Sequence, residues 1–324
     1  MFRKLLFALL TLTILLAACS PAVTLAPPLP VTSSPLPPVS ASPTPAPITL
    51  TDGLGRTVTL AAPAQRIVLL APSNTEILFA VGAGAQIVGR DEASDYPAEA
   101  LALPTVGGWS GFSSEAIVAL QPDLVLGLAG DFNPPELAAE LEGLGLTVFY
   151  LPNPATIEEM YTNLETVGKL TGHESEATAL IESLQARVAV VDAQIASIAE
   201  RPVVFYELDA ANPSKPWTAG PGSFIDLLIA RAGGTNAAGQ LQGAWVQVSL
   251  EEIILLDPDL IILGDSLYGE TPEKVAARTG WEVLRAVQEG KVYPFDDNLV
   301  SRPGPRLVDG LEALAKLLHP GLFK

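Results

Sequence analysis

Three tryptophans lie in segments rich in glycine or proline, where a flat aromatic face is available to a ligand. Trp109 occurs in GGWSGF, Trp217 in SKPWTAG and Trp245 in GAWVQV. Loop residues carry function more often than packing, and an indole ring offers a flat apolar surface. The three are therefore candidate contacts for a large, flat ligand; the alternative is that they cover the bases of loops. Trp281, in the helix-like run TGWEVLRAV, is predicted to lie in the core.

Residues suited to hydrolytic or metal chemistry are sparse in the chain. Its two histidines, His173 and His319, are too far apart in sequence to suggest a zinc or manganese site. Residues 220–223 read GPGS, which is the wrong order for the nucleophile elbow of serine hydrolases. Residues 82–84 read GAG but follow a predicted helix, whereas a dinucleotide fingerprint follows a strand. We therefore predict that the protein is not an enzyme and has no cofactor or metal of its own.

The first 20 residues, MFRKLLFALLTLTILLAACS, combine a basic start, an apolar core and small residues before Cys19. This pattern is typical of an export signal and not of a membrane-spanning helix. Residues 16–19 (LAAC) also match the lipobox of bacterial lipoproteins, in which cleavage precedes the cysteine and the cysteine is lipidated. Cys19 is the only cysteine, so a lipid anchor would explain its presence. We predict a lipoprotein signal over residues 1–19; the alternative is an ordinary signal peptide with an incidental cysteine.

Residues 20–47 have the composition of an extended tether. Residues 20–51 contain no charged side chain, and ten of residues 21–47 are proline, so this stretch cannot bury a core. All 36 acidic residues lie beyond it, whereas Arg3 and Lys4 precede it. The remaining part is therefore strongly acidic, and we predict that it does not bind nucleic acid, which needs clustered Lys and Arg. Anchor and tether together predict a globular body held near the outer face of a bacterial membrane.

One pattern occurs twice, in residues 113–127 (SSEAIVALQPDLVLG) and residues 249–264 (SLEEIILLDPDLIILG). Each copy has a serine suited to cap a helix, a short amphipathic stretch, a proline and an apolar run. The proline ends the helix and favours extended geometry in the residue before it, and the apolar run is typical of a strand buried in a parallel sheet. The repeat predicts two similar α/β lobes; the alternative is a chance recurrence of a common helix–strand unit.

The order of predicted strands and helices along the chain indicates an N-terminal lobe over residues 48–171 and a C-terminal lobe over residues 201–324. Each lobe is expected to have a central, mainly parallel sheet flanked by helices. Residues 48–60 alternate as a β-hairpin, and strands are predicted at residues 66–71, 86–89, 124–127, 147–151, 202–208, 260–263 and 291–295. Helices are predicted at residues 73–81, with Ser73 as the cap, and at residues 223–232. A last helix is predicted near the C-terminus, where Leu307, Leu311, Leu314 and Leu318 would form one apolar face.

Residues 172–200 are predicted to join the lobes through one rigid helix. Residues 173–199 place apolar side chains at helical spacing and contain no glycine or proline. Such a helix would span roughly 40 Å, enough to cross from one lobe to the other. A stiff connector should keep domain closure small, so the cleft between the lobes is expected to be largely preformed and suited to a ligand.

Four stretches of the folded part occur in order: RIVLLAPSNTEILFAVGA, the triplet DYP at residues 95–97, WSGFSSEAIVALQPDLVL and WVQVSLEEIILLDPDLIIL. Together they resemble the iron-complex and vitamin B12 class of substrate-binding proteins of ABC importers, and most closely its vitamin B12-binding members. The likeness runs from about residue 48 to the C-terminus, with the binding domain itself over about 66–324. It implies the class III periplasmic-binding-protein fold, no enzymatic activity, and capture of a corrinoid for delivery to an ABC importer.

The resemblance also implies ligand-binding residues. Vitamin B12-binding members have tryptophans at positions that match Trp109 and Trp245 and a ligand-facing aromatic residue at the position of Trp217. Residues 302–306 (RPGPR) match their C-terminal Arg-x-x-Pro-Arg element. Ala93 and Leu128 stand where those members have two further aromatic contacts. The candidate ligand-binding residues are Trp109, Trp217, Trp245, Tyr96, Arg302 and Arg306.

Two other ligands remain alternatives within the same class. Haem-binding members offer Tyr or His to the iron, for which Tyr96 is the candidate here. Siderophore-binding members use several arginines in the cleft, for which Arg302 and Arg306 are the candidates. A surface scavenger or adhesin that uses the same fold without a transporter is an alternative from a different class.

Glu115 and Glu251 occupy equivalent positions in the two copies of the repeat. In the family that the chain resembles, glutamates at these positions pair with arginines of the dimeric permease, which implies a monomeric receptor docking one lobe on each permease subunit. The alternative is local, because an acid in the first helical turn gains about 0.3–1 kcal/mol from the helix dipole. Glu252, three residues after Ser249, has the spacing of a capping box, whereas Glu115 and Glu251 do not.

Overall fold

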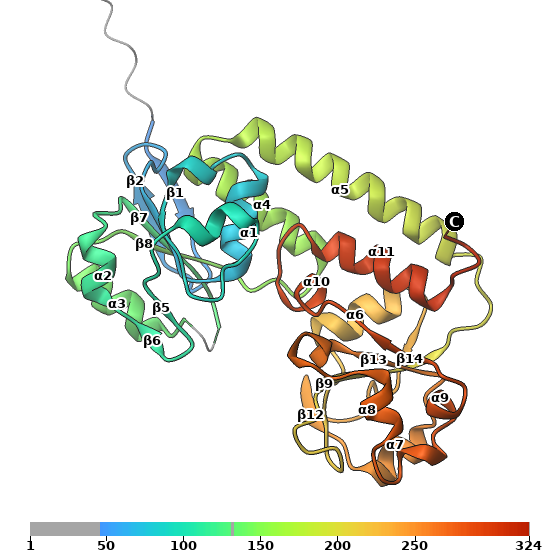
Figure 1. Cartoon of the computed structure of the whole chain (residues 1–324). Helices are drawn as coiled ribbons and strands as arrows, with labels where there is room; N and C mark the ends of the chain where they lie inside the picture. Colours follow the sequence, from blue (N-terminus) through green and yellow to red (C-terminus); the bar gives the residue numbers. More distant parts are fainter. Residues whose placement is uncertain (1–45, 131–132, 324) are drawn as a thin grey trace, which may run out of the picture. The chain divides into compact units, whose positions relative to one another are not determined.

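The computed structural model describes residues 46–130 and 133–323 (Figure 1). The predicted export signal, Cys19 and nearly all of the predicted tether lie outside the described residues. Within these two ranges, no helix is both long enough and apolar enough to cross a membrane. The described residues form one compact unit, which contains two larger β-sheets.

The N-terminal lobe is built on a four-stranded parallel sheet with the order β4-β3-β7-β8. Side chains of β3 alternate between two apolar clusters, with Ile67 and Leu69 on one face and Val68 on the other. Burial on both faces is why the strands read as continuous apolar runs. The predicted strands are confirmed, with the bounds β3 (Ile67–Leu69), β4 (Ile87–Gly89), β7 (Leu124–Leu128) and β8 (Val148–Leu151).

Two small antiparallel pairs accompany this sheet. Strands β1 (Ile48–Thr51) and β2 (Thr57–Leu60) form the predicted hairpin. Strands β5 (Gly107–Gly108) and β6 (Gly111–Phe112) form a second, very short hairpin whose turn contains Trp109.

The C-terminal lobe has a mixed sheet with the order β12-β10-β9-β13-β14, and β11 also pairs with β9. Strands β11, β9, β13 and β14 pair in parallel, whereas β10 and β12 form an antiparallel ribbon on the edge at β9. The bounds are β9 (Val203–Asp209), β10 (Trp217–Ala219), β11 (Thr235–Asn236), β12 (Trp245–Gln247), β13 (Leu260–Leu263) and β14 (Val292–Pro294). Trp217 therefore begins β10, which pairs with both β12 and β9, and Trp245 begins the edge strand β12. Their placement in loops was wrong because strands of three residues are too short to show alternation.

Helices connect successive strands along the chain in both lobes (Figure 1). Their bounds are α1 (Pro72–Ala80), α2 (Ser114–Ala119), α3 (Pro135–Gly143), α4 (Ile157–Thr171), α6 (Phe224–Arg231), α7 (Leu250–Leu256), α8 (Pro272–Ala276), α9 (Arg285–Gln288), α10 (Asn298–Ser301) and α11 (Leu307–Leu318). Ser73 does not cap α1, because the helix begins one residue earlier at Pro72, and proline is well suited to a first helical position. Trp281 is fully buried, as predicted.

The connecting helix α5 (Glu174–Ile195) packs against α4 of the N-terminal lobe and α11 of the C-terminal lobe (Figure 1). Its 22 residues span roughly 33 Å, which is less than the predicted 40 Å. The helix ends early because the chain tightens into a turn, in which the Ile198 N–H donates to the Ile195 carbonyl. An exposed ion pair adds to its packing, since Arg187 binds Asp309 and Glu312 of α11.

The two copies of the repeat fold alike. Ser113 caps α2 by accepting the Ala116 N–H, and Ser249 caps α7 through the predicted capping box with Glu252. The residues before the two prolines, Gln121 and Asp257, have φ values of 49° and 40°. They are left-handed and not extended as predicted, because each completes the C-terminal turn of its helix before the proline stops it.

Candidate functional site

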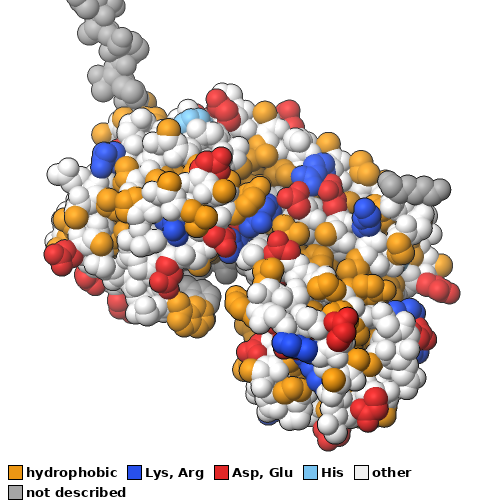
Figure 2. Space-filling model, in the orientation of Figure 1, with side chains coloured by type: hydrophobic (Ala, Val, Ile, Leu, Met, Phe, Trp, Pro, Cys, Tyr) orange, Lys and Arg blue, Asp and Glu red, His pale blue; other side chains and the backbone are white. Residues whose placement is uncertain are grey.

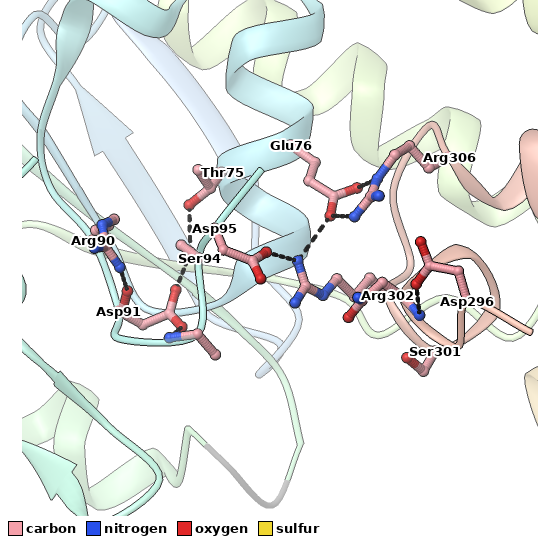
Figure 3. A network of polar contacts seen from close by, with 12 residues as sticks. Thr75, Glu76, Arg90, Asp91, Ser94, Asp95, Asp296, Ser301, Arg302 and Arg306 are labelled. Atoms are coloured by element: carbon pink, nitrogen blue, oxygen red, sulfur yellow. Dashed lines mark hydrogen bonds and ion pairs between the residues drawn. The ribbon is translucent and has the colours of Figure 1, made fainter. Parts of the chain in front are cut away.

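An ion-pair network joins the two lobes (Figure 3). Arg306 donates to Glu76 Oε2 through Nε at 2.9 Å and to Oε1 through Nη2 at 2.5 Å, and Arg302 Nη1 lies 3.3 Å from Oε1. Arg302 Nη1 also donates to Asp95 Oδ1 at 2.6 Å. The Glu76 side chain is 2% exposed and the two arginine side chains are 13% and 14% exposed. Two carboxylates therefore balance two guanidinium groups that are mostly withdrawn from water.

Tyr96 lies against the same network. The guanidinium carbon of Arg306 is 4.0 Å from the centroid of its ring, a distance typical of a cation–π contact. Burial alone would raise the pKa of Asp95, but the hydrogen bond and charge of Arg302 outweigh it and hold that pKa below its usual value. Asp95 is therefore charged at neutral pH and keeps Arg302 compensated. Of the predicted ligand-binding residues, the structure brings Tyr96, Arg302 and Arg306 together.

Trp217 and Trp245 share one face of the β10–β12 ribbon. Trp217 pairs with Gln247 and Trp245 pairs with Ala219, so the two indoles are diagonal neighbours. Side chains in this relation lie within about 7–8 Å and can be bridged by one aromatic ligand. The side chains are 41% and 55% exposed, and the ribbon therefore offers an apolar surface that the protein's own core leaves uncovered.

A pocket of about 280 Å³ adjoins this ribbon and reaches the N-terminal lobe. Residues of both lobes line it, and none of their side chains carries a formal charge: Asn153, Pro154, Ala155, Gly222, Ser223, Phe224, Ala244, Trp245, Val300, Ser301 and Pro303. Figure 2 shows a hollow between the lobes with hydrophobic side chains on both sides of it. The pocket is slightly smaller than most ligand sites, which have volumes of about 300–1,000 Å³, so a large ligand would place only one portion in it.

Trp109 lies at the tip of the β5–β6 hairpin in the N-terminal lobe. Its side chain is 82% exposed, and its backbone N–H donates to Glu92 Oε1 at 2.9 Å. The structure therefore places Trp109 on a separate element from Trp217 and Trp245. All three present a large part of an aromatic surface to solvent.

Glu115 and Glu251 lie in the first turns of α2 and α7, and both are exposed. The caps of these helices use Ser113, Ser249 and Glu252, so neither carboxylate takes part in capping. The positions of Glu115 and Glu251 are thus equivalent in structure as well as in sequence.

A second buried polar cluster lies at the carboxyl ends of β9 and β13. Glu207, which is fully buried, forms a bidentate ion pair with Arg278, and Arg278 also binds Glu270. Burial, and then repulsion from Glu207, raises the pKa of Asp265 to about 7 although the Ala210 N–H donates to it. The described ranges contain no cluster of His, Cys, Asp and Glu suited to a metal ion. We assign this cluster a role in stability because Glu207 and Arg278 are paired with each other inside the C-terminal lobe.

Stability should depend on the charge of Asp265. Its raised pKa means that the folded protein holds a proton that the unfolded chain releases above about pH 4, so stability falls as pH rises towards 7. We expect Asp265→Asn to be about 2 kcal/mol more stable than the wild type at pH 8 and to match it near pH 4. Urea unfolding at both pH values measures this, with Glu99→Gln as an exposed control. Equal stability of Asp265→Asn and wild type at pH 8 would contradict the assignment.

Sequence reasoning missed Glu76, Asp95 and Glu92 as site residues. Glu76 is a buried residue of helix α1. A carboxylate is seldom buried unless a cation pairs with it, so its position in a predicted buried helix could have indicated a cationic partner. Two arginines in RPGPR are that partner, but they lie 226 and 230 residues away in sequence. Spacing alone cannot connect such distant residues.

Comparison with known proteins identifies the family. The model of a family described as periplasmic binding protein matches residues 67–299, which is more than half of the chain. The chain belongs to the periplasmic binding protein family. An uncharacterised ABC transporter substrate-binding lipoprotein of Bacillus subtilis is 32% identical to this periplasmic binding protein over 281 residues, which cover 86% of this chain and 87% of the relative.

Solved structures agree with this assignment. The periplasmic vitamin B12 binding protein of Vibrio cholerae superposes with a TM-score of 0.68 at 28% identity, covering 80% of this chain and 98% of that one. A periplasmic haem-binding protein of Roseiflexus superposes with a TM-score of 0.71 at 26% identity, covering 79% and 98%. The predicted class III fold, with two α/β lobes joined by a long helix, is confirmed.

Membership in the family establishes the general activity. Periplasmic binding proteins of this kind are extracytoplasmic proteins that bind chelate ligands and deliver them to an ABC permease with its ATPase, and they are not enzymes. The relatives named above include binders of vitamin B12 and of haem. The ligand of this chain must therefore be argued from its own site.

Proposed function

We propose that this binding protein captures a corrinoid, such as cobalamin, in the cleft between its lobes. The observation that carries the proposal is the charge state of the site. Arg302 and Arg306 are already compensated by Glu76 and Asp95, and the adjoining pocket has no charged side chain. A corrinoid is a large, flat chelate with carboxamide groups around its ring, which need neutral hydrogen-bonding partners and aromatic surface.

The same observation argues against an anionic chelate. Haem carries propionate carboxylates, and many ferric siderophores are anionic. Burying a carboxylate is costly unless a cation pairs with it, and the cations of this site are engaged. The strongly acidic chain adds a long-range repulsion for anions. Haem remains the second candidate because Tyr96 is 47% exposed and has a phenol oxygen able to bind iron.

We propose Trp109, Trp217 and Trp245 as the aromatic contacts, and we expect cobalamin to quench the protein's fluorescence in a saturable, one-to-one titration. Trp109→Ala combined with Trp245→Ala should weaken binding by a few kcal/mol, since each aromatic pair contributes about 0.5–1.5 kcal/mol beyond its buried area. Titrations with cobalamin, haemin and a ferric siderophore measure this. Tyr268→Ala, which removes an 89% exposed aromatic residue elsewhere, is the control. No response to cobalamin with tight binding of haemin would overturn the corrinoid assignment.

We propose that Glu115 and Glu251 dock the two lobes on the two subunits of the permease. Both carboxylates are exposed, and neither has a role in capping its helix. Transport then requires a surface on each lobe, which accounts for the recurrence of the repeat.

We further propose that Cys19 is lipidated and anchors the protein to the outer face of a bacterial membrane. An N-terminal lipoprotein anchor carries more than one acyl chain, and two or more chains are needed for stable attachment. We expect Cys19→Ser to move from the membrane fraction to the soluble extracytoplasmic fraction on ultracentrifugation. Recovery of Cys19→Ser with membranes to the same extent as wild type would show that the cysteine is incidental.

A further inference from the structure

The β5–β6 hairpin that carries Trp109 is rich in glycine. The hairpin contains Gly107, Gly108 and Gly111. Gly107 and Gly111 have φ values of 119° and 116°, which favour glycine. Glycine supplies no side chain for packing, and it loses more conformational freedom on ordering than any other residue. Contacts from outside the hairpin therefore contribute to fixing its conformation.

Glu92 supplies that support. Its backbone N–H donates to the Gly107 carbonyl at 2.8 Å, and its carboxylate oxygen Oε1 accepts the Trp109 N–H at 2.9 Å. Its side chain also lies directly against Gly108, where a Cβ atom would come within 2.3 Å of Glu92 Cγ. One residue therefore contacts three consecutive residues of the hairpin, ending at the tryptophan.

A buried polar cluster of Arg90, Asp91 and Ser94 (Figure 3) fixes the backbone of Glu92. Arg90, which is 7% exposed, donates from Nη1 to the carbonyls of Asp91 at 2.9 Å and of Glu92 at 3.3 Å. The Asp91 carboxylate accepts the Ala93 N–H at 2.9 Å and the Ser94 hydroxyl. Asp91 and Ser94 are 3% and 1% exposed. The exposed carboxylate of Glu92 thus extends from a rigid base.

We infer that Glu92 is a positioning residue, which orients Trp109 towards the ligand by holding the β5–β6 hairpin on the buried Arg90–Asp91–Ser94 cluster. The role that we infer for Glu92 is exerted through its contacts with Gly107, Gly108 and Trp109. The inference rests on the proposed function of Trp109 as a ligand contact. The requirement for glycine at position 108 follows from it, because any side chain there would displace the carboxylate.

The first test needs no ligand. In a protein with Trp217→Phe and Trp245→Phe, the remaining tryptophans are exposed Trp109 and buried Trp281, so time-resolved fluorescence anisotropy reports on Trp109. Glu92→Ala should lower the residual anisotropy, whereas Glu92→Gln should retain it because the amide oxygen still accepts the Trp109 N–H. Unchanged anisotropy in Glu92→Ala would overturn the inference.

The second test measures cobalamin affinity with all tryptophans present. Losing one hydrogen bond of this kind should weaken binding about three- to tenfold in Glu92→Ala, with rescue in Glu92→Gln and no change in the exposed control Glu99→Ala. On a Trp109→Ala background, Glu92→Ala should have no further effect. An equal loss on both backgrounds would overturn positioning through Trp109. If the wild type fails to bind cobalamin, the proposed function is wrong, and the anisotropy measurement alone decides the role of Glu92.

Discussion

Replacing Glu76 by glutamine should destabilise the protein and raise its affinity for anionic chelates. The change leaves Arg306 and Arg302, whose side chains are 14% and 13% exposed, with too little compensating charge. Removing one partner of a buried ion pair costs about 3–5 kcal/mol, and we expect about 2–3 kcal/mol here because Asp95 still binds Arg302. The released guanidinium groups would then be available to the carboxylates of haemin or of an anionic siderophore.

Urea unfolding and tryptophan-fluorescence titrations measure the two effects of Glu76→Gln. Glu312→Gln is the matched control, because it removes a carboxylate from an arginine at an exposed pair between α5 and α11. Exposed pairs contribute about 0–1 kcal/mol, so this control should change little in either measurement. Glu76→Gln with unchanged stability and no gain in haemin binding would mean that the arginines are not held by Glu76, and the charge argument for a corrinoid would lose its basis.

The strands of the fold were predictable from the sequence because burial on both faces leaves an unmistakable apolar run. Ile67–Leu69 and Leu260–Leu263 are buried throughout, and both were predicted close to their observed ends. Helix ends were harder to predict, because they depend on tertiary contacts. The predicted helix over 173–199 stops at Ile195 without any glycine or proline to mark the end.

The candidate site was predictable only in part. Its tryptophans stood out because their glycine- and proline-rich surroundings contain no apolar helical face. The ribbon that aligns Trp217 with Trp245 could not be predicted, since each strand has three residues and the pairing joins segments 28 residues apart. The partners of Arg302 and Arg306 come from the opposite lobe, and no local pattern records a contact across that distance.

Reversing the charge of Glu115 and Glu251 together should abolish uptake and stimulation of the transporter ATPase while leaving ligand affinity near the wild-type value. The two carboxylates are exposed on equivalent helices, one on each lobe, and do not cap those helices. Lysine at both positions would place like charges opposite the permease arginines that the family resemblance implies. Like-charge contacts at an interface cost several kcal/mol. Single reversals should be milder and more sensitive to salt, because exposed charges mainly set association rate.

A matched double variant separates docking from helix stability. Glu136 and Glu273 are also exposed acids in first helical turns, of α3 in the N-terminal lobe and α8 in the C-terminal lobe. Reversal to lysine at these positions removes the same dipole interaction, about 0.3–1 kcal/mol each, with no expected effect on transport. Loss of uptake in both double variants would trace the defect to the helices themselves. Normal uptake in Glu115→Lys/Glu251→Lys would mean that the repeat is architectural only, since two equivalent surfaces would then have no partner to bind.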